Sequence, residues 1–144
     1  MNIHIASDHA GFKLKERIRA WLESSGYVVV DHGAYKLIPD DDYPIYARKL
    51  AKAVAKEKGR GILLCGSGVG MAIAANRIKG VRAVEGMSVK QVSLSRQDND
   101  SNVLVFGAWS LTKKETERLV EVWLKTKFSK AGRHFRRIRQ LDKL

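Results

Sequence analysis

The apolar positions of this chain follow two spacings that alternate along the sequence. Short apolar runs, typical of buried strands, occur five times, at residues 2–6, 27–30, 61–65, 81–84 and 103–106. Between most of these runs, apolar residues recur at every third or fourth position, as in amphipathic helices. Five strands that alternate with helices predict one α/β domain over residues 1–144, a doubly wound parallel sheet with helices on both faces.

The helical segments differ in how clearly the sequence marks them. The first ends at Gly26, the second opens at Pro44 and ends at Lys58-Gly59, and a long one spans Thr112 to Phe128. An Ala-rich segment, residues 71–76, is predicted to be a helix as well, and Val89 to Gln97 is compatible with one. From Gly132 onward the apolar spacing predicts a C-terminal helical tail.

Polar residues gather where the predicted strands end. They form the turn Ser7-Asp8-His9, the turn after Cys65, and the stretch between the fourth and fifth strands. In parallel sheets, sites lie outside the carboxyl ends of the strands. We therefore expect these three clusters to converge on one crevice, with the loop 31–42 and its three aspartates as a wall.

The segment Cys65-Gly66-Ser67-Gly68-Val69-Gly70 joins a strand to a helix. It has neither the spacing of a dinucleotide-binding turn nor the lysine of a P-loop. Its N–H groups form a cradle for a phosphate or for a transient oxyanion. They and the helix N-terminus are expected to lower the pKa of the Cys65 thiol, which would make it a base or nucleophile. The alternative is a tight connection with a buried, inert cysteine.

Asp8 and His9 place a carboxylate beside an imidazole at a strand end. Such a pair can orient a sugar hydroxyl or move its proton. The alternative is a helix-capping aspartate followed by an exposed histidine.

The charge is concentrated in the tail. Lys and Arg number 27 against 15 Asp and Glu, and seven of the twelve net positive charges fall in residues 125–144. Arg133 and Arg137, one helical turn apart with His134 beside them, suit a phosphate. The alternative is a solvated basic face, and we expect no nucleic-acid partner.

One cysteine excludes an intramolecular disulfide, and neither a targeting segment nor a membrane span is visible, so a cytoplasmic protein is expected.

Motifs along residues 2–139 resemble those of ribose-5-phosphate isomerase B, in the family that includes galactose-6-phosphate isomerase. The segments that carry the resemblance are Ser7-Asp8-His9, Asp42-Tyr43-Pro44, Cys65 to Gly70, Ala74-Ala75-Asn76-Arg77, Ser95-Arg96-Gln97, Asn99 to Leu104 and Gly132-Arg133-His134. The resemblance implies a Rossmann-like fold and a cofactor-free, metal-free aldose–ketose isomerase. It also implies a homodimer, or a tetramer of two dimers, whose sites use residues of both chains, with the tail (about 129–144) packed on the partner.

The resemblance also implies roles for individual residues. Cys65 would move the proton next to the sugar carbonyl through a cis-enediolate, while the N–H groups of Gly66, Ser67, Gly68, Val69 and Gly70, with the Ser67 side chain, would hold the oxyanion. The groups that would contact the sugar or its phosphate are Asp8, His9, Asn99, Arg133, His134 and Arg137.

Two positions depart from the family pattern. Asp98 stands where many members have the histidine that opens the sugar ring, and Trp109 where many have a phosphate-binding arginine. Ring opening then falls to Asp98 if burial keeps it protonated, to Asp8, or to water. Arg136 is a candidate to replace the missing cation.

These departures leave three interpretations. The leading one is isomerisation of D-ribose 5-phosphate to D-ribulose 5-phosphate. The second is isomerisation of another aldose, such as a hexose 6-phosphate, with Trp109 stacked on the sugar. The third is a sugar-phosphate sensor that binds without converting.

Overall fold

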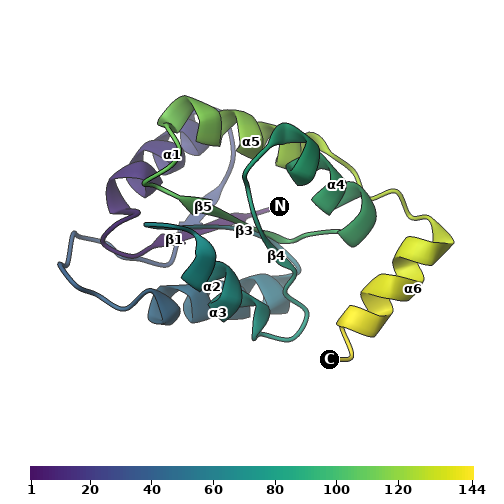
Figure 1. The fold of residues 1–144 in the computed structure, drawn as a ribbon. Helices are drawn as coiled ribbons and strands as arrows, with labels where there is room; N and C mark the ends of the chain where they lie inside the picture. Colours follow the sequence, from purple (N-terminus) through teal and green to yellow (C-terminus); the bar gives the residue numbers. More distant parts are fainter.

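The computed structural model describes all 144 residues as one α/β unit (Figure 1). Its helices and strands, in chain order, are β1 Ile3–Ser7, α1 Phe12–Ser24, β2 Val29–Asp31, α2 Tyr43–Glu57, β3 Arg60–Cys65, α3 Val69–Asn76, β4 Ala83–Glu85, α4 Val89–Asn99, β5 Val103–Gly107, α5 Lys113–Lys125 and α6 Gly132–Leu141. The five strands are parallel in the order β2-β1-β3-β5-β4. The predicted fold class, doubly wound with a helical tail, is confirmed. None of the helices has the length and apolar character needed to cross a bilayer.

The helices cover both faces of the sheet. Figure 1 shows α1, α4 and α5 on one face and α2 and α3 on the other. Alternate residues of β3 point to opposite faces, with Ile62 and Leu64 in the core beneath α1 and α5, and Leu63 and Cys65 in the core against α2 and α3. The cysteine therefore belongs to the α2–α3 layer.

Two strand boundaries differ from those predicted from the sequence. The apolar run 27–30 suggests a strand from Tyr27, but β2 begins at Val29, because the Tyr27 N–H caps α1 by donating to Leu22 O at 3.0 Å. Gly26, at φ +86°, supplies the left-handed residue that this cap requires. β4 begins at Ala83 rather than at residue 81, because the Val81 N–H closes a turn with Ile78 O and the Arg82 N–H donates to the Asn102 side chain.

The order of the strands fixes where a ligand crevice lies. From β1 the chain crosses one face to the edge strand β2, then returns across the other face to β3, which pairs with β1 on its opposite side. Such a reversal opens a crevice between β1 and β3 at their carboxyl ends. Asp8 follows β1 and Cys65 ends β3, so the two flank this crevice.

Candidate functional site

Asp8 is the first residue after β1, and its side chain is buried, with 5% of the residue exposed. Its carboxylate accepts the Gly11 N–H at 3.0 Å, and its own N–H donates to Leu64 O at 3.3 Å, so it lies beside the end of β3. Gly11 must be glycine, because a Cβ there would lie 2.4 Å from Leu64 O. Burial raises the pKa of the Asp8 carboxyl despite the Gly11 hydrogen bond. Asp8 thus caps the turn before α1 and also faces the crevice.

His9 is paired with an aspartate that sequence analysis did not single out. Its ring Nδ1 lies 2.7 Å from Asp41 Oδ1, and its backbone N–H donates to the same oxygen at 2.8 Å. The hydrogen bond that Asp41 accepts raises the pKa of His9. Burial opposes ionisation of Asp41, but the two His9 hydrogen bonds, the Tyr46 hydroxyl and the His9 charge together lower the pKa of the Asp41 carboxyl. The His9–Asp41 pair thereby holds the loop before α2 beside the crevice. This loop forms the wall that the sequence predicts.

Cys65 is 4% exposed, and its Sγ accepts the Gly68 N–H at 3.1 Å. Burial raises the pKa of the thiol, and the Asp8 charge adds to the rise, while the N–H groups of Gly68 and Met71 oppose it. The predicted lowering of this pKa is therefore wrong, because desolvation outweighs the N–H donors and the helix N-terminus. The resting thiol is protonated, and once ionised it is a stronger base than a thiolate of low pKa.

The glycine turn is lined by two aromatic rings. Gly68 has φ +88°, a left-handed conformation that places its N–H on the cysteine sulfur. A Cβ on Gly66 would lie 2.5 Å from the Trp109 ring, and one on Gly70 would lie 2.5 Å from the Tyr43 ring. Ser67 is exposed, and its hydroxyl accepts the Val69 N–H at 3.3 Å. The alternation of glycines thus serves close packing of aromatic rings as well as access to the N–H groups.

Asp98 and Asn99 lie near the amino ends of the strands, whereas Cys65 lies at the carboxyl end of β3. α4 starts near the carboxyl end of β4 and crosses the sheet, so its last residues lie where β5 begins. Asn102, which follows them, pairs through its N–H with Arg82 O just before β4. The expectation that the whole polar stretch between the fourth and fifth strands joins the crevice is therefore wrong for residues 98–102.

The tail residues join this second group. α6 packs on α4, and Figure 1 shows it as the yellow helix at the end of the sheet remote from the loop between β2 and α2. His134 is 5% exposed, with its Nδ1 2.7 Å from Ser129 Oγ and 3.7 Å from Asp98 Oδ1. Arg133 and Arg137 remain exposed on the helix surface. The structure thus assembles Asp98, Asn99 and the tail residues away from Cys65.

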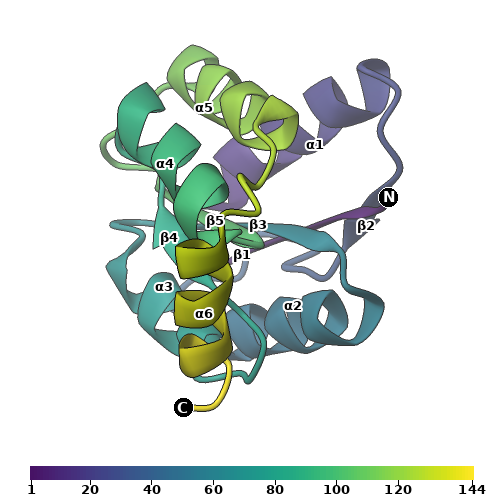
Figure 2. The same ribbon diagram turned by 90° about the vertical axis from the view of Figure 1, so that its right-hand side faces the viewer.

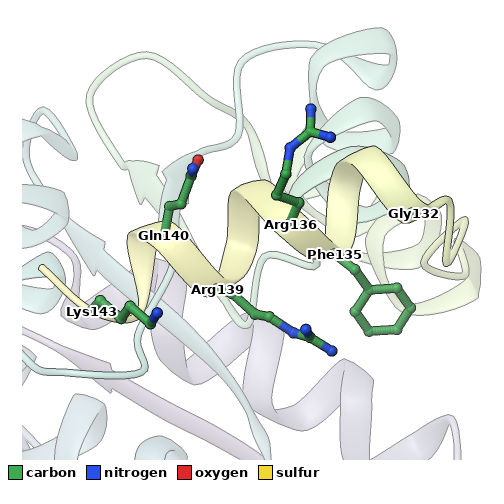
Figure 3. Close-up of a pocket in the computed structure, with 6 residues that line it drawn as sticks. All are labelled: Gly132, Phe135, Arg136, Arg139, Gln140 and Lys143. Atoms are coloured by element: carbon green, nitrogen blue, oxygen red, sulfur yellow. The ribbon is translucent and has the colours of Figure 1, made fainter.

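Two further contacts hold α6. Ile138 is buried, and Arg82 Nη1 donates a hydrogen bond to Asp142 Oδ1 at 2.9 Å, forming an ion pair. Figure 2 shows α6 as a column along the side of the molecule. Its outer side carries a hollow of about 570 Å³ lined by Gly132, Phe135, Arg136, Arg139, Gln140 and Lys143 (Figure 3). Basic side chains therefore extend beyond Arg133 and Arg137 over much of the helix.

One set of side chains has the spacing of a metal site. The ligand atoms of Asp8, His9 and Asp41 lie within 4.8 Å of one another. His9 bonds to Asp41, and Asp8 accepts the Gly11 N–H, whereas Asp41 Oδ2 is buried without a hydrogen-bond partner. The expectation of a metal-free, cofactor-free site stays a prediction.

Comparison with known proteins gives a consistent family. Residues 3–141 match the ribose/galactose isomerase family. Ribose-5-phosphate isomerase B of Escherichia coli is 42% identical over 137 residues, 94% of this chain and 91% of that protein. The crystal structure of a Thermotoga maritima ribose 5-phosphate isomerase has a TM-score of 0.94 at 41% identity and covers 99% of this chain and 98% of its own.

A related structure from Mycoplasma genitalium, a ribose-5-phosphate isomerase B with bound ribulose-5-phosphate, gives the same TM-score and identity, with 99% and 94% of the two chains covered. Family match, sequence identity and fold agree over nearly the whole length. The chain is an isomerase that belongs to the ribose/galactose isomerase family.

Proposed function

We propose that the protein interconverts D-ribose 5-phosphate and D-ribulose 5-phosphate. The observation that carries the proposal is the buried Cys65 at the β1–β3 crevice, with its sulfur held by an N–H of the glycine turn. A relative with 41% identity, crystallised with ribulose-5-phosphate, supports this choice of sugar.

The chemistry follows from a base beside N–H donors. Cys65, ionised when the substrate is bound, takes the proton from the carbon next to the aldehyde, and the carbonyl oxygen becomes the oxyanion of a cis-enediolate. The N–H groups of Gly66 to Gly70 and the Ser67 hydroxyl stabilise that charge. The proton then goes to the former aldehyde carbon, while the hydroxyl proton on the oxygen of the deprotonated carbon moves to the oxyanion. The ketose forms with no net gain or loss of atoms. Burial of the thiol supports this role, because a desolvated thiolate is a strong base.

The phosphate half of the site is proposed to come from a second copy of the chain. Asp98, Asn99, Arg133 and Arg137 lie at the opposite ends of the strands from Cys65, so one chain does not unite them with it. A homodimer in which the tail of one protomer reaches the Cys65 crevice of the other would complete both sites. His134, buried between Ser129 and Asp98, would then set the position of Arg133, to which it lies within hydrogen-bond distance.

Opening of the sugar ring needs an acid, and two carboxyl groups compete for the role. Burial raises the pKa of Asp8, which favours the protonated form that can donate. The Asp98 side chain is 44% exposed. We therefore propose Asp8 as the acid and place Asp98 near the ring oxygen as a second-chain contact. Asp98→His tests this assignment, because an added imidazole acid would speed turnover of the cyclic substrate only if Asp8 does not already open the ring.

The test of the proposal is turnover by the parent chain and by Cys65→Ala. The parent should convert ribose 5-phosphate, and the variant should lose about 10²- to 10⁴-fold in kcat while its Kd for the sugar phosphate, from calorimetry, stays measurable. Full turnover by the variant would remove the thiol from the mechanism.

A side-by-side panel of pentose and hexose phosphates decides the substrate. Preference for a hexose 6-phosphate would show that the protein is a hexose-phosphate isomerase and would overturn the ribose assignment. Binding without conversion of any sugar would identify a sensor instead.

A further inference from the structure

Trp109 lies directly on the glycine turn. Strand pairing continues past the ends of β3 and β5, with Ala108 N–H donating to Cys65 O at 2.8 Å and Trp109 N–H to Gly66 O at 3.0 Å. A Cβ built on Gly66 would lie 2.5, 2.6 and 2.7 Å from three consecutive atoms of the six-membered ring of the indole. Near-equal distances to neighbouring ring atoms place Gly66 over the face of the ring rather than at its edge. The indole is thus laid flat on the backbone that follows Cys65.

The rest of the indole is open. Trp109 is 78% exposed, the most exposed aromatic residue among the large apolar residues at the surface. Its neighbours along the chain, from Gly107 to Leu111, include no charged side chain. A ligand bound at the Gly66 end of the turn therefore lies beside a large uncharged ring.

We propose that Trp109 is a specificity residue that packs against the carbon chain of the sugar, whereas the phosphate is held elsewhere. The inference rests on the proposed function, since it assumes a sugar phosphate in the Cys65 crevice. An indole offers a flat apolar face to C–H groups and offers no charge to a phosphate, so it discriminates by the carbon skeleton. Gly66 covers one face of the ring, so the opposite, open face is the one that a sugar bound beside the turn would meet.

The experiment measures binding in the Cys65→Ala background, where turnover is expected to be too slow to disturb the measurement. The probes are D-ribose 5-phosphate and inorganic phosphate, with affinity from calorimetry. Adding Trp109→Ala should raise the Kd of ribose 5-phosphate by about three- to tenfold, the range expected for loss of one aromatic contact. The Kd of inorganic phosphate should change by less than about twofold. Trp109→Phe should restore part of the loss. Equal losses for both probes, or no loss for the sugar phosphate, would overturn the proposal.

Intrinsic fluorescence gives an independent signal. Ribose 5-phosphate should shift the emission of the exposed Trp109, and inorganic phosphate should not. Trp21→Phe, a change of a half-buried tryptophan packed on the α1 core, should leave the shift in place, and Trp109→Phe should abolish it. A shift that persists in Trp109→Phe would contradict the assignment.

The two proposals fail differently. If the parent turns over ribose 5-phosphate but the Trp109 variants behave like it, only the specificity role is lost. If neither the parent nor Cys65→Ala binds any sugar phosphate, both the function and the role of Trp109 are overturned.

Discussion

At the scale of single residues, Cys65 is subject to two opposed influences. The Gly68 N–H at 3.1 Å stabilises a thiolate, while burial in the α2–α3 core and the nearby Asp8 stabilise the thiol. Burial has the larger effect, so the protonated thiol is favoured and its pKa is raised. At neutral pH a thiol in such surroundings therefore reacts slowly with electrophiles.

The first prediction concerns pH. Because the pKa of Cys65 lies above its ordinary value, the thiolate fraction should rise about tenfold per pH unit through neutrality. The rate of alkylation by iodoacetamide should follow this rise from about pH 7 to pH 9. Cys65 is the chain's only cysteine, so the reaction reports on it alone, and Cys65→Ala is the blank. A rate that is already flat above pH 7 would mean a low thiol pKa.

The sequence shows which residues are candidates for chemistry better than it shows their partners. Cys65, Asp8 and the glycine turn stand out because their residue types and their positions after strands are visible in the chain. The contacts of Asp41 with His9 and of Tyr43 with Gly70 could not be predicted, because Asp41 lies in a long irregular loop and Tyr43 is the residue at which that loop passes into α2. The three consecutive aspartates were the one available signal, and they did not show which of them turns inward.

At the scale of elements, the existence and order of the helices and strands were predicted better than their ends, and the helix expected to reach Phe128 ends at Lys125. The mixed pattern at Val89 to Gln97 does form helix α4, and the tail does form α6. β2 and β4 have three residues each, and both were predicted to start two residues too early, because the residues before them form a helix cap and a turn. A run of apolar residues shows burial, and hydrogen bonds with neighbours decide where a strand starts.

The start of α5 supports a prediction about stability. The Thr112 hydroxyl accepts the Glu115 N–H at 3.3 Å, and the Glu115 carboxylate accepts the Thr112 N–H at 2.8 Å, forming a capping box. Thr112→Ala should lower the free energy of unfolding by about 1 kcal/mol, measured by urea denaturation. Thr112→Ser keeps the hydroxyl and should lose much less. Equal losses in the two variants would show that the methyl group, and not the cap, is responsible.

At the scale of the whole molecule, the candidate site is divided between the two ends of the parallel strands. Asp8, His9 and Cys65 lie at the carboxyl ends, while Asp98, Asn99 and the arginines of α6 lie at the amino ends. From the pattern of polar residues, the stretch between β4 and β5 was expected in the Cys65 crevice of the same chain, because that segment was treated as a loop that stays at the carboxyl ends of the strands. Once α4 crosses the sheet within that segment, its two termini lie at opposite ends of the strands, and a site that needs both groups needs two chains.

This division predicts complementation between two inactive variants. Cys65→Ala changes only the residues at the carboxyl ends of the strands, and Arg137→Ala only those at the amino ends. In a mixed dimer, one of the two sites therefore has an intact Cys65 from one chain and an intact Arg137 from the other. Random pairing at a 1:1 ratio makes half of the dimers mixed, each with one of its two sites restored. Joint refolding of the two chains should therefore recover about a quarter of the parent activity.

The matched control is a mixture of Cys65→Ala with Asp8→Ala. Both changes lie at the carboxyl ends of the strands, so every site in every dimer carries one of them, and this mixture should stay inactive. Recovery in the control as well would point to contamination by parent chain. If differently tagged Cys65→Ala and Arg137→Ala chains copurify as mixed dimers yet regain no activity, the arginine acts in the same chain as the cysteine, and the shared site is wrong.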